Sequence, residues 1–213
     1  MEQIREDLWL ASFGTLGGVN HCGFLLLRPE GNVLFYGAPG EEDFEQISAL
    51  GGIAHHVLSH RHEACPSPDL VKKAFGALLC SDAEEAPAIR EESRVDVTFA
   101  RTDCALGSVK VIHTPGHTRG GISCVYESPL GETYLFSGDT MIPVKDQWIA
   151  QIVPEHGGDG AVLIGSLLRL RDVEPDLVLS SASIGEYEAV AVENEEWLRA
   201  IENTAGRAPI GSS

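Results

Sequence analysis

Three apolar segments of the chain each end in side chains that can bind a metal ion. Residues 53–58 lead directly to His60 and His62, a later segment leads to His117, and a third leads to Asp139. Short apolar runs bounded by turn residues are typical of buried strands. Imidazole and carboxylate groups at the ends of such strands are a usual ligand set for zinc. The sequence therefore predicts a fold of buried strands whose ends meet at a metal site.

The chain alternates short apolar strands with helical patterns, which indicates an α/β fold (α+β in some schemes). Its 213 residues are 43% hydrophobic, enough for one domain with a sizeable core. We expect a single domain over residues 1–213, with its core at about 7–203 and a loose tail at 204–213. Strands are predicted at 9–11, 22–27, 32–36, 53–58, 78–80, 122–126 and 133–136 and within 95–111, and helices at 41–50, 67–75, 83–89, 161–171 and 188–203.

The order of the motifs resembles the metallo-β-lactamase superfamily, in particular its small glyoxalase II-like and persulfide dioxygenase-like members. The resemblance rests on His60-x-His62, on His117 within HTPGHT and on Asp139 within SGDT, and it extends from Trp9 to about Leu198. It implies a four-layer αββα sandwich, in which two packed β-sheets have helices outside and ligands on loops along one edge. It also implies that His60, His62, His117 and Asp139 are both the metal ligands and the catalytic residues.

The sequence departs from the superfamily at a second set of positions. The motif H-x-H-x-D-H ends here in Ala64 and Cys65, and the superfamily's last histidine falls at Ala182. An aspartate that usually ends the second N-terminal strand is replaced by Tyr36 or Gly37. In the superfamily the first three of these positions hold a second metal ion, so their loss predicts a mononuclear site. Cys65 is most simply a small buried thiol, and its alternative role is a thiolate ligand that restores part of the second site.

Three functions are consistent with this site. The first is a metal-dependent hydrolase of a small acyl, ester or thioester substrate, with one Zn²⁺ and a metal-bound hydroxide, since zinc lowers the pKa of its water to about 7. The second is a mononuclear Fe²⁺ dioxygenase of a sulfur compound, since two histidines and a carboxylate form the usual iron triad. The third is a non-catalytic binding protein that kept the fold.

Other residues near the motifs have simpler interpretations. His113 is expected to be a packing residue or to support a ligand. His55 and His56 are neighbours in a strand and point to opposite faces, so structural roles are expected for both. His156 is in a loop, where it could line the mouth of the site. Glu63 could replace the missing base at Ala64 only if the backbone turned it toward the metal.

Charge and composition limit the partners. The chain has 15 basic and 32 acidic residues, a net charge of −17, which disfavours nucleic acids and anionic membranes and leaves a small-molecule substrate. No apolar run of about 18 residues appears, and residues 1–7 lack the apolar region of a secretory signal. Five cysteines without a C-x-x-C motif favour thiols in a reducing cytoplasm. The oligomeric state is open.

Overall fold

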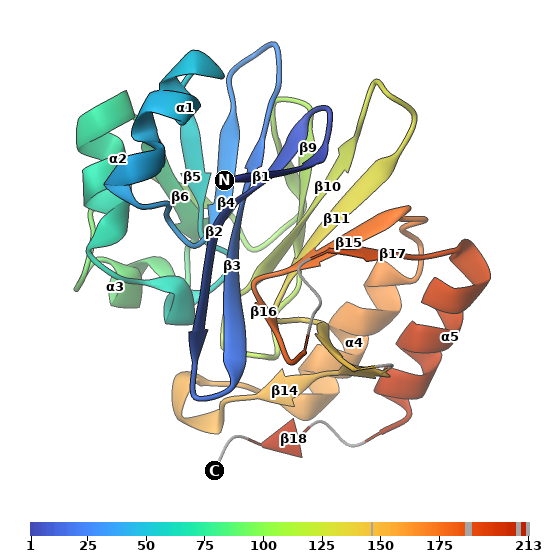
Figure 1. Cartoon of the computed structure of the whole chain (residues 1–213). Coiled ribbons are helices and arrows are strands. Elements are labelled where there is room, and N and C mark those ends of the chain that lie inside the picture. Colours follow the sequence, from blue (N-terminus) through green and yellow to red (C-terminus); the bar gives the residue numbers. More distant parts are fainter. Residues whose placement is uncertain (146, 186–188, 208–209, 212–213) are drawn as a thin grey trace.

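Two β-sheets pack face to face in the computed structural model, which describes residues 1–145, 147–185, 189–207 and 210–211. Helices cover the outer face of each sheet (Figure 1). The first sheet has the order β1 (Glu2–Arg5), β2 (Leu8–Leu16), β3 (Val19–Leu26), β4 (Val33–Tyr36), β5 (His55–Val57), β6 (Leu78–Asp82) and β7 (Val97–Phe99), with β16 (Ala182–Ser183) also pairing with β3. The second has the order β17 (Val190–Ala191), β15 (Leu177–Ser180), β11 (Thr133–Gly138), β10 (Ile122–Glu127), β9 (Val109–His113) and β8 (Cys104–Leu106).

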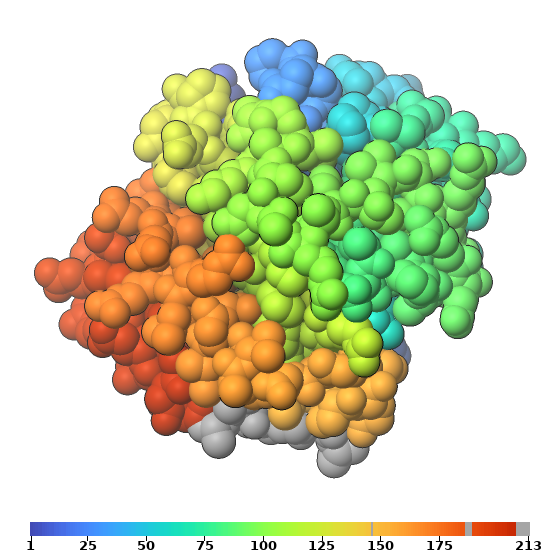
Figure 2. Space-filling model, turned by 180° about the vertical axis from the view of Figure 1, so that it is seen from behind, coloured from blue at the N-terminus to red at the C-terminus, as the bar shows by residue number. Residues whose placement is uncertain are grey.

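The remaining elements are two short strand pairs and the helices. The strand pairs are β12 (Ile142–Val144) with β13 (Gln147–Ile149), and β14 (Gln151–Ile152) with β18 (Ile210–Gly211). The helices are η1 (Glu41–Asp43), α1 (Phe44–Ala49), η2 (Arg61–Glu63), α2 (Ser67–Phe75), α3 (Ala86–Ile89), η3 (Pro154–His156), α4 (Gly160–Leu170) and α5 (Asn194–Ala205). Seen from behind, α2 and α3 lie on one flank and α4 and α5 on the other (Figure 2).

The strands are apolar on both faces because both faces are buried. In β11, Phe136 points into the core between the sheets, while its neighbour Leu135 packs with Leu163 of α4. In the first sheet, the Phe35 ring stacks on Phe136 with ring centroids 3.8 Å apart, whereas Leu34 faces α1. Successive side chains of a strand point to opposite faces. The predicted four-layer αββα sandwich is therefore confirmed.

Several expected boundaries differ from the structure. The helix predicted at 188–203 begins only at Asn194, because Val190–Ala191 form β17 beside β15 and a capping box of Glu193 and Glu196 starts α5. Residue 188 lies outside the described residues. Within the segment expected as a loose tail, the structure describes the end of α5 at Ala205 and the pairing of Ile210–Gly211 with β14. In the described part of the chain, no helix is long and apolar enough to span a membrane.

His56 shows how the first sheet depends on pH. As expected for a structural residue, it is buried, and its Nε2 donates to the Tyr36 carbonyl at 2.7 Å. Burial lowers the pKa of His56 to about 4, although the carbonyl opposes that shift. Because this pKa lies below the usual 6.5, the neutral ring contributes stability that is fully present above pH 6.5 and is lost as pH falls toward 4.

We expect the His56→Gln variant to lose less stability on acidification than the wild type. Two pKa units correspond to about 2–3 kcal/mol, so the fall in unfolding free energy from pH 7 to 4.5 should be smaller by that amount. Urea unfolding at the two pH values measures the difference. The exposed His21 provides a matched control, and His21→Gln should fall as the wild type does. An equal fall of the unfolding free energy in all three proteins would show that burial does not hold the His56 ring in its neutral form.

Candidate metal centre

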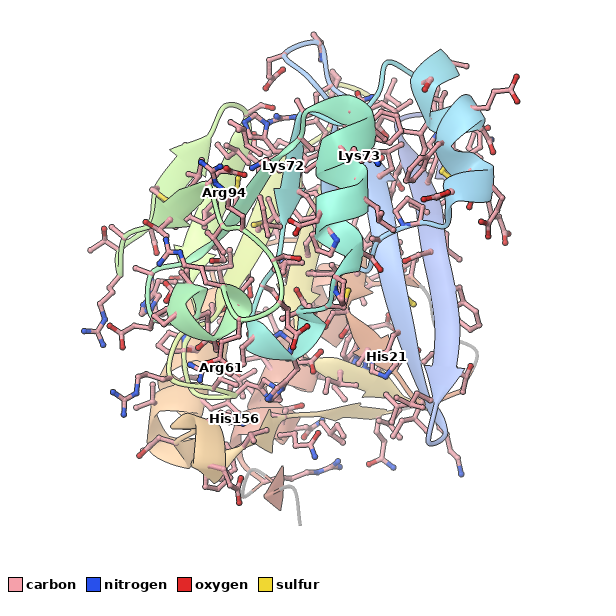
Figure 3. All side chains as sticks on the ribbon, turned by 90° about the vertical axis from the view of Figure 1, so that its left-hand side faces the viewer. His21, Arg61, Lys72, Lys73, Arg94 and His156 are labelled. Carbon is pink, nitrogen blue, oxygen red and sulfur yellow. The ribbon has the colours of Figure 1, made fainter. Side chains whose placement is uncertain are left out.

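Each candidate ligand follows the end of a strand. His60 comes three residues after β5, and the short η2 turn then places His62 beside it. His117 lies in the loop after β9, and Asp139 directly follows β11. Strands β4, β5 and β6 are parallel, so their carboxyl ends share one edge of the sheet. Figure 3 shows this end of the molecule, where Arg61 and His156 lie, opposite the end that carries Lys72 and Arg94.

The structure brings all four predicted ligands together. The His62 Nδ1 and His117 Nε2 atoms are 3.2 Å apart. Asp139 Oδ2 lies 3.5 Å from His60 Nε2 and 3.6 Å from His117 Nε2. The three imidazole rings are mutually near perpendicular, with ring centroids 4.8 to 5.2 Å apart. Their facing nitrogens all lie within 4.8 Å of one another, a spacing that one ion can bridge.

The outer nitrogens of two histidines are already occupied. His60 Nδ1 lies 3.1 Å from Glu63 Oε1, and His117 Nδ1 donates to the Gln151 carbonyl at 2.8 Å. Such partners fix the ring and the tautomer of a metal-binding histidine and leave the other nitrogen free for the ion. His60 Nε2 is buried and has no hydrogen-bond partner among the described residues. The donor set therefore fits a metal ion.

The cavity beside the candidate ligands has room only for a small occupant. One cavity of about 10 Å³ is lined by His60, His117 and Asp139, together with neighbouring loop residues. This is about the space that a single water molecule needs. A larger cavity of about 670 Å³ lies between the β12–β13 hairpin and α5 and is lined by none of the four ligands.

The charges of the cluster are strongly coupled. Burial disfavours a charge on His60, but the carboxylates of Asp139 and Glu63 outweigh it and raise the His60 pKa to about 9. Burial, followed by the neighbouring His60 and His117, lowers the pKa of His62 to about 3. Burial raises the pKa of Asp139, but the nearby histidines His60 and His117 outweigh it and lower that pKa overall. A cation at the centre of the cluster must therefore compete with a proton on His60.

Asp139 is held by Ser181 and, through the Gly138 backbone, by Tyr36. The Ser181 hydroxyl donates to Asp139 Oδ1. The Tyr36 hydroxyl accepts from the backbone N–H of Gly138 at 2.8 Å and donates to the Leu179 carbonyl at 3.2 Å. Tyr36 is buried and has φ +66°, a left-handed conformation that is uncommon for a residue other than glycine. Tyr36, which ends β4, thus supports Asp139 through the backbone of Gly138.

The remaining sequence interpretations have mixed outcomes. Glu63 does not face the metal side, because its carboxylate accepts from the Ser59 N–H and hydroxyl and contacts the outer nitrogen of His60. The backbone orientation that a replacement base would require is therefore not present. His156 is closer than expected, with its Nδ1 2.6 Å from His62 Nε2. His113 stays outside the cluster, 3.5 Å from Asp82.

None of the positions of the lost second site belongs to a group of metal-ligating side chains in the described residues. Cys65 is not part of the histidine cluster, and its carbonyl accepts from Ser93. Ala64 packs beside the apolar cluster around Leu58. Ala182 is buried in β16, opposite His21 of β3.

The chain was compared with protein families and with proteins of known function. No family model matches the chain. A hydroxyacylglutathione hydrolase of Rhizobium etli is 27% identical over 222 aligned residues, which cover 92% of this chain and 81% of that protein. By its name this relative is a hydrolase.

Solved structures show the same fold. A metallo-β-lactamase from Pontibacter korlensis has a TM-score of 0.69 and 21% identity, over 94% of this chain and 97% of that chain. The metallo-β-lactamase FIM-1 from Pseudomonas aeruginosa, in its mono-zinc form, has a TM-score of 0.70 and 15% identity, over 96% and 95%. The chain therefore has the metallo-β-lactamase fold, and the resemblance to that superfamily which its motifs indicated is confirmed.

Proposed function

We propose that the chain is a metal-dependent hydrolase of a small acyl, ester or thioester substrate and holds one Zn²⁺ with His60, His62, His117 and Asp139. One observation carries the proposal: the buried His60 Nε2, which has no hydrogen-bond partner in the described residues and lies 3.5 Å from Asp139 Oδ2. Buried polar atoms are rarely left without a partner. A metal ion would satisfy this atom.

The residues around the centre have defined tasks in this proposal. Bound zinc would supply a Lewis acid that polarises a carbonyl and acidifies a water molecule. Glu63 keeps a proton on His60 Nδ1, and the Gln151 carbonyl keeps one on His117 Nδ1, so both rings present Nε2 to the centre. Asp139 offsets part of the positive charge. Ala64 cannot accept a proton, so we expect slow turnover or proton transfer assisted by the substrate.

The single ion is supported by the lost second site. Ala64 and Ala182 have no ligand atom in their side chains, and Cys65 lies outside the histidine cluster. His62 is the exposed member of the cluster, so substrate would approach from its side. The acidic composition supports a small-molecule substrate rather than a nucleic acid or a membrane surface. The cysteine content supports a cytoplasmic location.

A mononuclear Fe²⁺ dioxygenase acting on a sulfur compound is the second candidate. It is favoured by the burial of His60 and His117 beside Asp139, while His62 is exposed. Two histidines and one carboxylate with open positions are the usual ligands of iron in oxygenases. Metal analysis separates the two candidates, because a dioxygenase would retain iron after purification and would consume oxygen.

Metal analysis combined with a substrate panel tests the proposal. We expect about one zinc per chain after purification, and hydrolysis of at least one simple thioester or lactone. Chelation should abolish this hydrolysis and added zinc should restore it. Two zinc ions per chain would contradict the single-ion site. Absence of metal after zinc supplementation would instead favour the non-catalytic binding protein.

A further inference from the structure

We propose that Glu85 is a positioning residue of the metal centre, which ties the loop of His62 to the loop of His117. The inference rests on the proposed function, because it assumes that these two histidines share a metal ion. Glu85 lies in neither motif and follows strand β6, at the start of α3. Its side chain is completely buried.

The carboxylate of Glu85 binds both loops, and its Oε1 also accepts from Arg61 Nη2 at 3.3 Å. Oε2 accepts from the backbone N–H of Arg61 at 3.0 Å and from Arg61 Nε at 2.6 Å. Oε1 accepts from the backbone N–H of Gly120 at 2.6 Å and from the Thr118 hydroxyl at 3.1 Å. Arg61 stands between His60 and His62 in the sequence, and Thr118 directly follows His117. One side chain therefore binds the immediate neighbours of three predicted ligands.

The contact with the His117 loop is close enough to exclude a side chain. A Cβ atom at position 120 would lie 2.4 Å from Asp82 Oδ1 and 2.9 Å from Glu85 Cγ and Oε1, so a glycine at this position lets the loop approach both carboxylates. Glu85 itself is anchored by its helix, because Ala86 and Ile89 pack with Leu79 of β6 and with Leu58, which follows β5. The backbone of Glu85 is therefore held in place, and its carboxylate contacts the loop of His62 and the loop of His117.

The electrostatics suit a permanently ionised group. Burial raises the pKa of Glu85, but the hydrogen bonds from Arg61 and Gly120 outweigh it and lower the pKa overall. Charge-assisted hydrogen bonds of this kind are roughly twice as strong as neutral ones. One backbone hydrogen bond, from the Ile122 N–H to the Ser59 carbonyl at 3.1 Å, also joins the two segments, but it lies on the far side of His60 from His62 in the sequence. Glu85 binds directly beside His62 and His117, so the 3.2 Å spacing of His62 Nδ1 and His117 Nε2 should depend on it.

The zinc affinity of the full-length Glu85→Gln variant tests this role. Glutamine keeps the size of the side chain but loses the charge and sets an amide donor against the N–H donors of one loop. Groups that orient metal ligands typically contribute 10–100-fold to metal affinity, so we expect zinc to bind about 10–100-fold more weakly. The measurement is competition for zinc against a chromophoric chelator, with the Co²⁺ absorption spectrum as a second readout of ligand geometry.

Glu84→Gln is the matched control. Glu84 is the neighbouring residue, and its carboxylate lies 3.5 Å from Arg101 rather than at either loop. Its zinc affinity should equal that of the wild type. A merely structural role for Glu85 would lower the urea midpoint of the metal-free Glu85→Gln protein and leave its zinc affinity and Co²⁺ spectrum unchanged. That result would overturn the proposal.

A milder variant covers the case in which Glu85→Gln does not fold. Arg61→Lys keeps the positive charge but removes the Nε contact to Glu85, and we expect a zinc affinity between those of wild type and Glu85→Gln. An unchanged affinity would contradict the role of Glu85. Wild-type protein that binds zinc but hydrolyses no substrate would overturn the proposed function alone. Wild-type protein that binds no zinc would overturn both.

Discussion

Replacement of His117 by alanine is expected to weaken zinc binding by more than about 100-fold and to abolish hydrolysis. Loss of a group that only orients a ligand costs about 10–100-fold, and loss of the ligand should cost more. His117 is buried, its Nδ1 is fixed by the Gln151 carbonyl, and its Nε2 faces both His62 and Asp139. Alanine leaves no atom that could replace that nitrogen. Zinc titration of the metal-free variant measures the loss.

His55→Ala serves as the control for this result. His55 lies at the start of β5, whereas His60 and His62 follow the end of that strand. It has the same side chain but belongs to no group of metal ligands within the described residues. The control variant should bind one zinc with wild-type affinity. A His117→Ala protein that binds zinc as tightly as His55→Ala would show that the four predicted ligands do not form the site.

The grouping of the four candidate ligands could be predicted from the sequence because they are side chains that follow strand ends. His60, His117 and Asp139 each follow a short apolar segment. His60 follows β5 of the first sheet, whereas His117 and Asp139 follow β9 and β11 of the second sheet, which run in the same direction because β10 pairs antiparallel with both. The layers could also be predicted, since an unbroken apolar run such as residues 134–136 indicates a strand that is buried on both faces. Apolar runs and the residues that follow them are local features, so they can be recognised in the sequence.

The supporting groups could not be predicted because their contacts are distant or use the backbone. The partner of His117 Nδ1 is the carbonyl of Gln151, and a carbonyl has no sequence signature. Glu85 lies 24 residues from Arg61 and 35 from Gly120, and its charge looks like that of any surface glutamate. The start of α5 was misplaced for a different reason, because pairing of β17 with β15 overrides the helical spacing after residue 188.

Gly116→Ala is expected to be the most damaging change within the HTPGHT turn. Gly116 has φ +125°, and a Cβ atom there would lie 2.3 Å from the backbone nitrogen of Leu163. The left-handed backbone costs about 1–2 kcal/mol for alanine, and forcing extra atoms into a packed site adds about 1–3 kcal/mol. We therefore expect the unfolding free energy to fall by about 2–5 kcal/mol, measured by urea denaturation of the metal-free protein.

The matched variant Gly131→Ala separates the two contributions. Gly131 lies in the turn between β10 and β11 and also has a positive φ of +97°, but a Cβ atom there would meet nothing within 4 Å. It should lose only the backbone contribution of about 1–2 kcal/mol. Gly116→Ala should also weaken zinc binding, because the N-terminus of α4 would push the turn and His117 with it, while Gly131→Ala should not. Equal destabilisation and equal zinc affinity in the two variants would mean that α4 does not press on the turn that positions His117.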